Sequence, residues 1–242
     1  MSYFDRTPAP LPDLPEVFDL QGISCHVVGG DLPSLSLALQ HEQSVEINPA
    51  ALLWKDEAAA LTVEPSGAVL VRGPARIGLS LRLVGQIFPL PLLRGDTVQV
   101  RLGHFLFAAG AERRSSQVRG LAARITGGAG AAFDSFRAFD QGGVVWVQAA
   151  GGVLERALAD GEALDMRAEA FLVKDDSVQM ETVIAGQGDS AAFSWPCLRL
   201  KGAGRVALQT GAAPSAEPAP AVEQASHRQR MFGIEFPLGR RR

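Results

Sequence analysis

The chain has 242 residues, of which 47% are apolar and 20% are charged, and its formal net charge is −3. This length allows one large domain with a substantial core, and the charge balance does not favour nucleic acid as a partner. No apolar run approaches the roughly 20 residues that a membrane-spanning helix needs, so we expect no transmembrane segment.

Residues 1–20 are rich in proline and acidic residues and are predicted to form an N-terminal arm. They lack the basic start and the apolar stretch of a secretory signal peptide. The two cysteines, Cys25 and Cys197, lie on hydrophobic stretches without C-x-x-C spacing. We expect them to be buried thiols in a reducing compartment, which predicts a cytoplasmic protein.

Residues 21–211 alternate between apolar and polar side chains, as in Leu35–Leu39 and Leu79–Leu83. Such alternation is typical of β-strands with one face in a core and the other in water. No long stretch has the 3.6-residue period of a helix. Residues 21–211 are therefore predicted to form one all-β domain.

A thirteen-residue cassette occurs three times in this domain, at Glu42–Trp54, Gly95–Phe107 and Gly161–Val173. Each copy starts with polar or turn-forming residues, alternates apolar and polar residues, bends, and ends in three apolar residues. This pattern predicts a strand, a tight corner and a second, more buried strand. The repetition predicts an all-β fold of repeated antiparallel sheets with pseudo-threefold internal symmetry, of the double-stranded β-helix kind.

A second motif follows each cassette, at Gly67–Val71, Gly143–Val147 and Gly204–Leu208. Its glycine permits a tight hairpin, and the β-branched residues after it favour a strand. We expect the three units to place equivalent residues in the core. These residues are Val45, Ile47, Leu53, Val98, Val100, Leu106, Leu164, Met166 and Leu172.

Catalytic and metal-binding patterns are missing from the sequence. The four histidines, His26, His41, His104 and His227, lack H-x-H or H-E-x-x-H spacing. No metal site, cofactor or catalytic residue is therefore predicted, and the protein is expected not to be an enzyme. His104, inside the second cassette, is expected to be packed or hydrogen-bonded.

Two charged patterns have structural interpretations. Lys55-Asp56 and Lys174-Asp175 follow the first and third cassettes at matching positions, which predicts a repeated turn. The arginines between Arg113 and Arg124 form one modest basic stretch, for which a solvated face is the first interpretation and anion binding the second.

The C-terminal part of the chain divides in two. Residues 212–230 are rich in alanine and proline and are predicted to be a linker that buries too little apolar surface to fold. Residues 231–242 are apolar and then basic, and are predicted to dock on the chain's own sheet edge, a neighbouring subunit or another protein. The predicted interaction residues are Phe232, Ile234, Phe236, Arg240, Arg241 and Arg242.

Four segments, taken in order, resemble one protein family: Asp31–Leu35, Val45–Trp54, Gly143–Gly152 and Lys201–Thr210. Together they are similar to the altered inheritance of mitochondria protein 24 family, whose bacterial members are catalogued as a domain of unknown function. The family's usual Glu-Pro-Gly-Ala core appears here as Ile47–Ala50, without the glycine.

The resemblance implies an all-β fold related to the trp RNA-binding attenuation protein and a homo-oligomer, for which a trimer is one candidate. It supplies no catalytic residues. The function that fits best is a non-enzymatic scaffold or assembly protein that acts through its sheet faces and its C-terminal segment. The alternative is a small-molecule or nucleic-acid binding module, which rests on analogy of fold.

Overall fold

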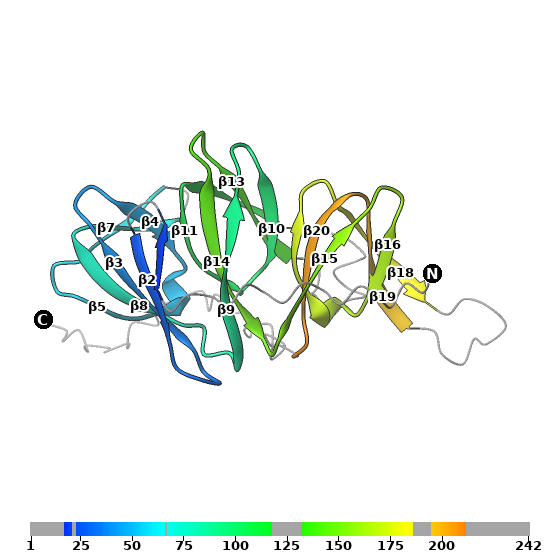
Figure 1. Cartoon of the computed structure of the whole chain (residues 1–242), viewed down its shortest axis with the longest axis horizontal. Helices are drawn as coiled ribbons and strands as arrows, with labels where there is room; N and C mark the ends of the chain where they lie inside the picture. Colours follow the sequence, from blue (N-terminus) through cyan, green and yellow to red (C-terminus); the bar gives the residue numbers. More distant parts are fainter. Residues whose placement is uncertain (1–16, 21–22, 66, 118–131, 186–194, 212–242) are drawn as a thin grey trace, which may run out of the picture.

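The computed structural model describes residues 17–20, 23–65, 67–117, 132–185 and 195–211, which form antiparallel strands and two 3-10 turns (Figure 1). The first elements are β1 (Val17–Leu20), β2 (Ile23–Val28), β3 (Ser34–Leu39), β4 (Ser44–Ile47), η2 (Pro49–Ala51), β5 (Leu52–Lys55), β6 (Ala60–Val63), β7 (Val69–Arg72) and β8 (Ala75–Leu79). The middle elements are β9 (Gly85–Leu92), β10 (Thr97–Arg101), β11 (Phe105–Ala109), β12 (Ala111–Gln117), β13 (Ala132–Ala138) and β14 (Gly143–Ala150). The last are β15 (Val153–Leu158), β16 (Ala163–Met166), η3 (Ala168–Ala170), β17 (Phe171–Asp175), β18 (Gln179–Ala185), β19 (Trp195–Lys201) and β20 (Gly204–Gln209).

Within the described residues, strands β3 to β20 form three units of six that share one set of pairings. Unit 1 contains β3–β8, unit 2 contains β9–β14, and unit 3 contains β15–β20. In every unit the first and third strands pair with the sixth, and the second and fourth pair with the fifth. Strand β1, which the sequence places in the arm, pairs with β2 and extends the sheet of unit 1.

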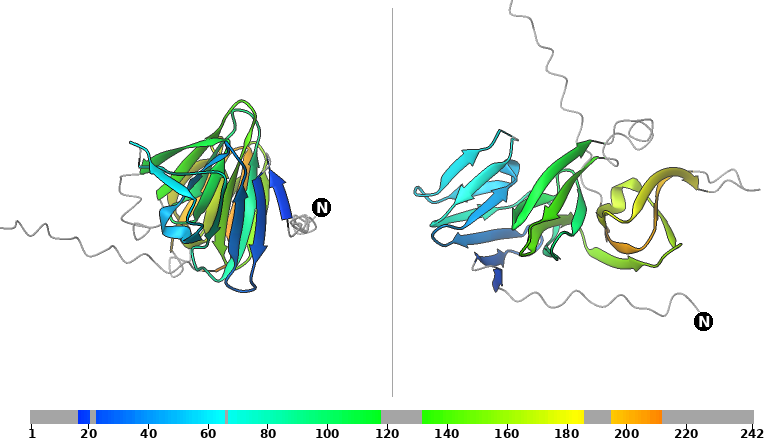
Figure 2. Two further views of the ribbon diagram at one scale, coloured as in Figure 1. Left: turned by 90° about the vertical axis from the view of Figure 1, so that its left-hand side faces the viewer. Right: turned by 90° about the horizontal axis from the view of Figure 1, so that it is seen from above.

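Neighbouring units share their sheets, so the units are not separate domains. β4 of unit 1 pairs with β11 of unit 2, and β10 of unit 2 pairs with β17 of unit 3. The four sheets that result have the orders β1-β2-β3-β8-β5, β6-β7-β4-β11-β14-β9, β12-β13-β10-β17-β20-β15 and β16-β19-β18. The units follow one another along the longest axis of the molecule (Figures 1 and 2).

A hydrophobic core lies between each sheet and the next. Core 1 brings Leu37 and Ile77 of unit 1 together with Leu106 and Trp146 of unit 2. Cores 2 and 3 lie between the next pairs of sheets and are built in the same way. Every core between two sheets excludes water from apolar side chains of both sheets, and this burial is the main favourable contribution to folding.

The cassettes are confirmed as a strand, a corner and a second strand: β4 and β5, β10 and β11, β16 and β17. The corner is a 3-10 turn in the first and third cassettes and a tight turn at Gly103, with φ of +84°, in the second. In all three cassettes the pairing of the second strand shifts register between the eleventh and thirteenth residues. The shared irregularity supports the alignment residue by residue.

The three copies of the second motif were expected to be equivalent, and this prediction is wrong for unit 1. Gly143–Val147 and Gly204–Leu208 lie in the sixth strands β14 and β20, but Gly67–Val71 leads into β7, the fifth strand. The sixth strand of unit 1 is β8, which pairs with β3 and β5. In unit 1 both β7 and β8 are short, apolar-rich strands that follow a glycine, Gly67 or Gly73, so the local pattern does not distinguish them.

The core prediction fails for Leu53. Its side chain is 40% exposed, whereas its equivalents Leu106 and Leu172 are fully buried. Leu164 is half-buried, and the other seven predicted residues are buried. Leu53 lies on β5, at the open edge of the first sheet, where no preceding unit covers it.

Candidate functional site

The three histidines that the structure describes, His26, His41 and His104, belong to no metal-binding cluster. In the part of the chain that the structure describes, no group of three or more His, Cys, Asp or Glu side chains could hold a metal ion. His104 is buried as predicted, with Nδ1 2.8 Å from the backbone oxygen of Gln148. Burial lowers the pKa of His104 to about 4, so the ring is neutral at pH 7.

The two internal junctions between units use one strand register. At the first, Ile47 lies opposite Phe107 and Glu46 opposite Ala108. At the second, Val100 lies opposite Val173 and Gln99 opposite Lys174. In cassette terms, the sixth residue of one unit faces the thirteenth of the next, and the fifth residue faces the one after the cassette. The same geometry therefore holds at both junctions.

The seventh cassette residue binds the corner of the following unit at both junctions. Nη1 of Arg101 donates to the backbone oxygens of Ala168, Glu169 and Phe171, at 2.9, 2.8 and 3.3 Å. At the other junction Nδ2 of Asn48 donates to the backbone oxygen of Phe105, at 2.9 Å. Phe105 and Phe171 are equivalent, so two different side chains donate to equivalent carbonyls at the two junctions.

Arg101 is almost completely buried, and its burial lowers its pKa. A buried guanidinium is stable only where acceptors replace the lost water, and the three carbonyls do so. The equivalent residue in unit 3 is Arg167. It is exposed, and no hydrogen bond or ion pair of its side chain is found among the described residues.

An ion pair adds to the first junction. Nε of Arg113 on β12 lies 2.6 Å from Oε1 of Glu46 on β4, and the guanidinium lies 5.5 Å from the ring centre of Phe105. Burial raises the pKa of Glu46, and Arg113 partly opposes this rise. Arg113, which the sequence placed in a basic stretch, is therefore mostly buried between two units.

The repeated Lys-Asp pattern is confirmed as a repeated turn. Nζ of Lys174 donates to the backbone oxygens of Asp175 and Val178, and Nζ of Lys55 donates to those of Asp56 and Ala59. The two turns differ in their surroundings. Lys174 is 4% exposed because β10 covers its strand, whereas Lys55 is exposed on the uncovered β5.

At the two ends of the row of units, β5 and β16 have no inter-unit partner among the described strands. β5 is mostly exposed, whereas its equivalents β11 and β17 are buried along almost their whole length. Trp54 is 45% exposed and lies across Gly78, where an added Cβ would collide with the indole ring. At the other end β16 pairs, within the ranges that the structure describes, on one side only, with β19. These two edges are the first candidate functional surface.

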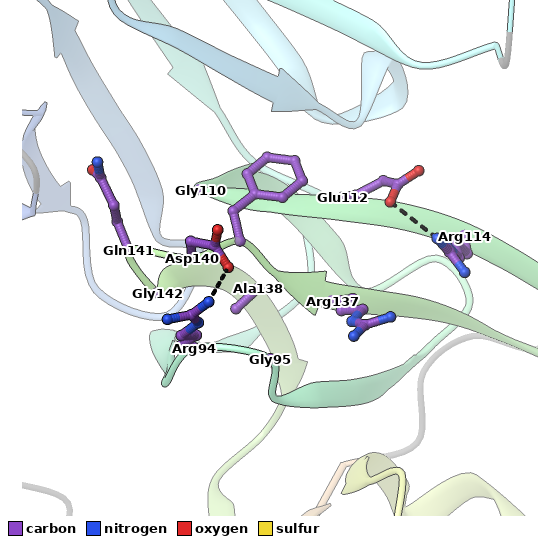
Figure 3. Close-up of a pocket in the computed structure, with 11 residues that line it drawn as sticks. Arg94, Gly95, Gly110, Glu112, Arg114, Arg137, Ala138, Asp140, Gln141 and Gly142 are labelled. Atoms are coloured by element: carbon purple, nitrogen blue, oxygen red, sulfur yellow. Dashed lines mark hydrogen bonds and ion pairs between the residues drawn. The ribbon is translucent and has the colours of Figure 1, made fainter.

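A groove of about 790 Å³ on unit 2 is the second candidate (Figure 3). Its walls carry Arg94, Arg114 and Arg137, and Phe139 also lines it with a side chain that is 55% exposed. Arg94 pairs with Asp140 at 3.1 Å, and Arg114 pairs with Glu112 at 3.3 Å. Arg137 makes no ion pair among the described residues, although Glu112 lies directly opposite it on β12.

The residues that the sequence proposed for interaction lie outside the described residues. They are Phe232, Ile234, Phe236, Arg240, Arg241 and Arg242. His227 and the predicted linker also lie outside them. The sequence reasoning missed the seventh cassette residues as interaction residues. An alignment of the three cassettes puts Asn48, Arg101 and Arg167 at this same position.

No helix among the described residues is both long and apolar enough to span a membrane. The structure is similar to the crystal structure of a protein from Streptococcus pyogenes, with a TM-score of 0.60 and 13% sequence identity. The match covers 78% of this chain and 94% of that one, and at this identity it shows a shared fold. No curated protein matches the sequence.

A family model described as mitochondrial biogenesis AIM24 matches residues 25–211, which include all three units. This range contains the four segments on which the resemblance was based. The chain therefore belongs to the mitochondrial biogenesis AIM24 family.

Proposed function

We propose that this protein is a non-enzymatic scaffold that assembles through the two open ends of its sheet stack, as a homo-oligomer. One observation carries the proposal: β5 is exposed where its equivalents β11 and β17 are buried. A sheet edge with unpaired backbone groups and large apolar side chains is a template for another strand.

The apolar side chains at this edge provide a driving force for assembly. Leu53 is 40% exposed and Trp54 45%, whereas Leu106 and Phe107 at the same positions are fully buried. Complete burial of a large apolar side chain contributes roughly 1.5–3 kcal/mol, and these two have about half of that still to gain. The backbone hydrogen bonds of β5 would add to this.

Light scattering after size exclusion tests the scaffold proposal. We expect the full chain to be larger than a monomer, and a chain with Leu53→Ser and Trp54→Ser to be monomeric. Val63→Ser is the matched control, because Val63 is 70% exposed and lies away from β5 on β6. A wild-type monomer at all concentrations would contradict the proposal.

The proposal includes a cytoplasmic location for the protein. The two cysteines are buried in different sheets, Cys25 on β2 and Cys197 on β19, which suits thiols in a reducing compartment. The C-terminal segment, residues 231–242, is included as a second interaction element. A pull-down that compares the full chain with a chain ending at Gly211 tests it, and loss of captured partners on truncation is the expected result.

Binding of a small anion is the second candidate function, favoured by the three arginines Arg94, Arg114 and Arg137 in the groove of unit 2, of which Arg137 makes no ion pair among the described residues. The two ion pairs there are exposed and therefore weak, so an anion could displace their carboxylates. Calorimetric titration with pyrophosphate tests this. Arg137→Ala should abolish binding, and Arg72→Ala, at the equivalent exposed position of unit 1, should not.

A further inference from the structure

We infer that β16 of one copy pairs with β5 of a second copy in the register of the internal junctions, and that Arg167 binds the η2 corner of that second copy. The inference rests on the proposed assembly and specifies its partner and contacts. It also gives Arg167 a role as an interface residue, equivalent to the role that Arg101 has inside the chain.

The register follows from the repeat. At both internal junctions the sixth cassette residue faces the thirteenth, and the fifth faces the one after the cassette. Applied to the open ends, this rule places Met166 opposite Trp54 and Asp165 opposite Lys55 of the next copy. The merged sheet would have the order β18-β19-β16-β5-β8-β3-β2-β1, and its first six strands would repeat the order of the two six-stranded sheets.

The side chain of Arg167 is exposed and makes no hydrogen bond or ion pair with the described part of the chain. Its equivalent Arg101 donates to the backbone oxygens of Ala168, Glu169 and Phe171 in the next unit. The residues at those positions in unit 1 are Pro49, Ala50 and Leu52, which form and follow η2. A guanidinium at position 167 could therefore make the same contacts with a second copy.

The charges at the two edges are complementary. Directly opposed residues on paired strands have Cβ atoms about 5 Å apart, and opposite charges there are favourable. Asp165, held by two 2.7 Å hydrogen bonds from Arg199, would face Lys55, whose Nζ is fixed on the turn carbonyls. At the internal junctions the same positions hold Glu46 with Ala108 and Gln99 with Lys174. Only the junction between copies would therefore join opposite charges.

The contact is heterologous, because each copy uses a different strand on its two sides. Such head-to-tail contacts produce closed rings or open filaments, whereas an isologous contact would stop at a dimer. A second copy is the partner that fits, since the chain itself contains the matching edge, register and corner. Because a heterologous contact joins two different strands, cross-linking between two different cysteine variants distinguishes it from an isologous contact.

Cysteine cross-linking between separately purified full-length variants tests the register. Asp165→Cys and Lys55→Cys should form a disulfide-linked dimer when mixed under oxidising conditions, and neither should do so alone. Asp165→Cys with Glu57→Cys, two residues along the chain from Lys55, should cross-link at least tenfold more slowly. Dimers of a single variant would show an isologous contact and would overturn the inference.

Substitution of Arg167 tests its role. Arg167→Ala should raise the dissociation constant of the assembly about tenfold or more, since charge-assisted hydrogen bonds to carbonyls are lost. Arg167→Asn should recover part of the affinity, because Asn48 binds the equivalent carbonyl at the first junction. The control Arg72→Ala removes another exposed arginine, on β7, and should have no effect.

The remaining outcomes separate this inference from the scaffold proposal. An oligomeric wild type that is insensitive to Arg167→Ala and does not cross-link at these positions would overturn the inference and leave the scaffold proposal standing. A wild type that is monomeric in every form would overturn both. A monomer that assembles only when truncated after Gly211 would place the chain's own tail on the edge, which also contradicts pairing in the full chain.

Discussion

The junction between units 2 and 3 and the open ends of the stack are built from equivalent residues in different surroundings. Arg101 is buried against three carbonyls, whereas Arg167 is exposed. Leu172 is fully buried, whereas Leu53 is 40% exposed. The same cassette residue is thus a core residue or a surface residue according to whether another unit lies beside it. Each prediction below changes one member of such a pair.

The largest expected effect is at the twelfth cassette residue. Leu106→Ala should lower the free energy of unfolding by about 2–5 kcal/mol, because it removes buried methyl groups and leaves a cavity in core 1. Leu53→Ala should lower it by less than about 1 kcal/mol in dilute, monomeric protein. Urea denaturation measures both. Equal losses would show that Leu53 is already buried in the monomer.

A pH-dependent effect should come from the tenth cassette residue, which is His104 in unit 2 and alanine in units 1 and 3. Its folded pKa of about 4 lies below its usual value of 6.5, so the unfolded state binds more protons between these pH values. The contribution of His104 to the free energy of unfolding should be fully present above pH 6.5. It should fall by about 3 kcal/mol as the pH drops to 4.

His104→Ala should remove this contribution to the pH dependence, although it also removes the contact with Gln148. Urea denaturation at a series of pH values compares the two slopes. A variant whose stability falls between pH 6.5 and 4 as steeply as that of the wild type would show that His104 is not the titrating group.

Arg101→Ala should lower the free energy of unfolding by about 2 kcal/mol, since three carbonyls in the corner of unit 3 lose their donor. Arg167→Ala should change the stability of the monomer by less than about 0.5 kcal/mol, as expected for an exposed side chain. Thermal and chemical denaturation of dilute protein give both values. A comparable loss in the two variants would remove the distinction between inner and outer positions.

Among the residues at the internal junctions, the smallest expected effect is at Asn48. Asn48→Ala should cost about 1 kcal/mol, because it removes the hydrogen bond to the backbone oxygen of Phe105 and the one that Oδ1 accepts from the backbone N–H of Ala50. Asn48→Asp keeps only the hydrogen bond accepted from the N–H of Ala50, so its stability should lie between those of the wild type and Asn48→Ala. Hydrogen exchange at the η2 turn reports the loss, and unchanged protection in Asn48→Ala would argue against a capping role.

Much of the fold could be predicted from sequence because its signals are local. Alternating residues such as Leu35–Leu39 predict strands, and the three cassettes predict repeated units with corners at fixed places. The assignment of Gly67–Val71 failed because fifth and sixth strands have the same local pattern. The exposure of Leu53 could not be predicted, since its sequence context matches those of Leu106 and Leu172. Its exposure depends on being first in the stack.

The candidate surfaces were harder to predict than the fold. Arg113 and Arg114 are neighbours in sequence, yet one is paired with Glu46 between units and the other lines the open groove. Successive residues of a strand point to opposite faces, so a run of arginines does not make a basic patch. The role of Arg167 becomes visible only when the contacts of Arg101 are known, because the sequence does not show which carbonyls a guanidinium reaches.

The sharing of cores between units also affects how the chain folds during synthesis. Core 1 contains Leu106, Phe107 and Trp146, which come from unit 2. The last strand of unit 1, β8, ends at Leu79, so unit 1 leaves the ribosome well before its core can close. Its apolar face stays exposed until β11 and β14 have been synthesised, because these strands supply the rest of core 1. Each later unit likewise closes the core of the unit before it. During that interval the exposed apolar sheet is a binding surface for a chaperone. Premature termination of translation between β8 and β14 would leave that sheet permanently exposed.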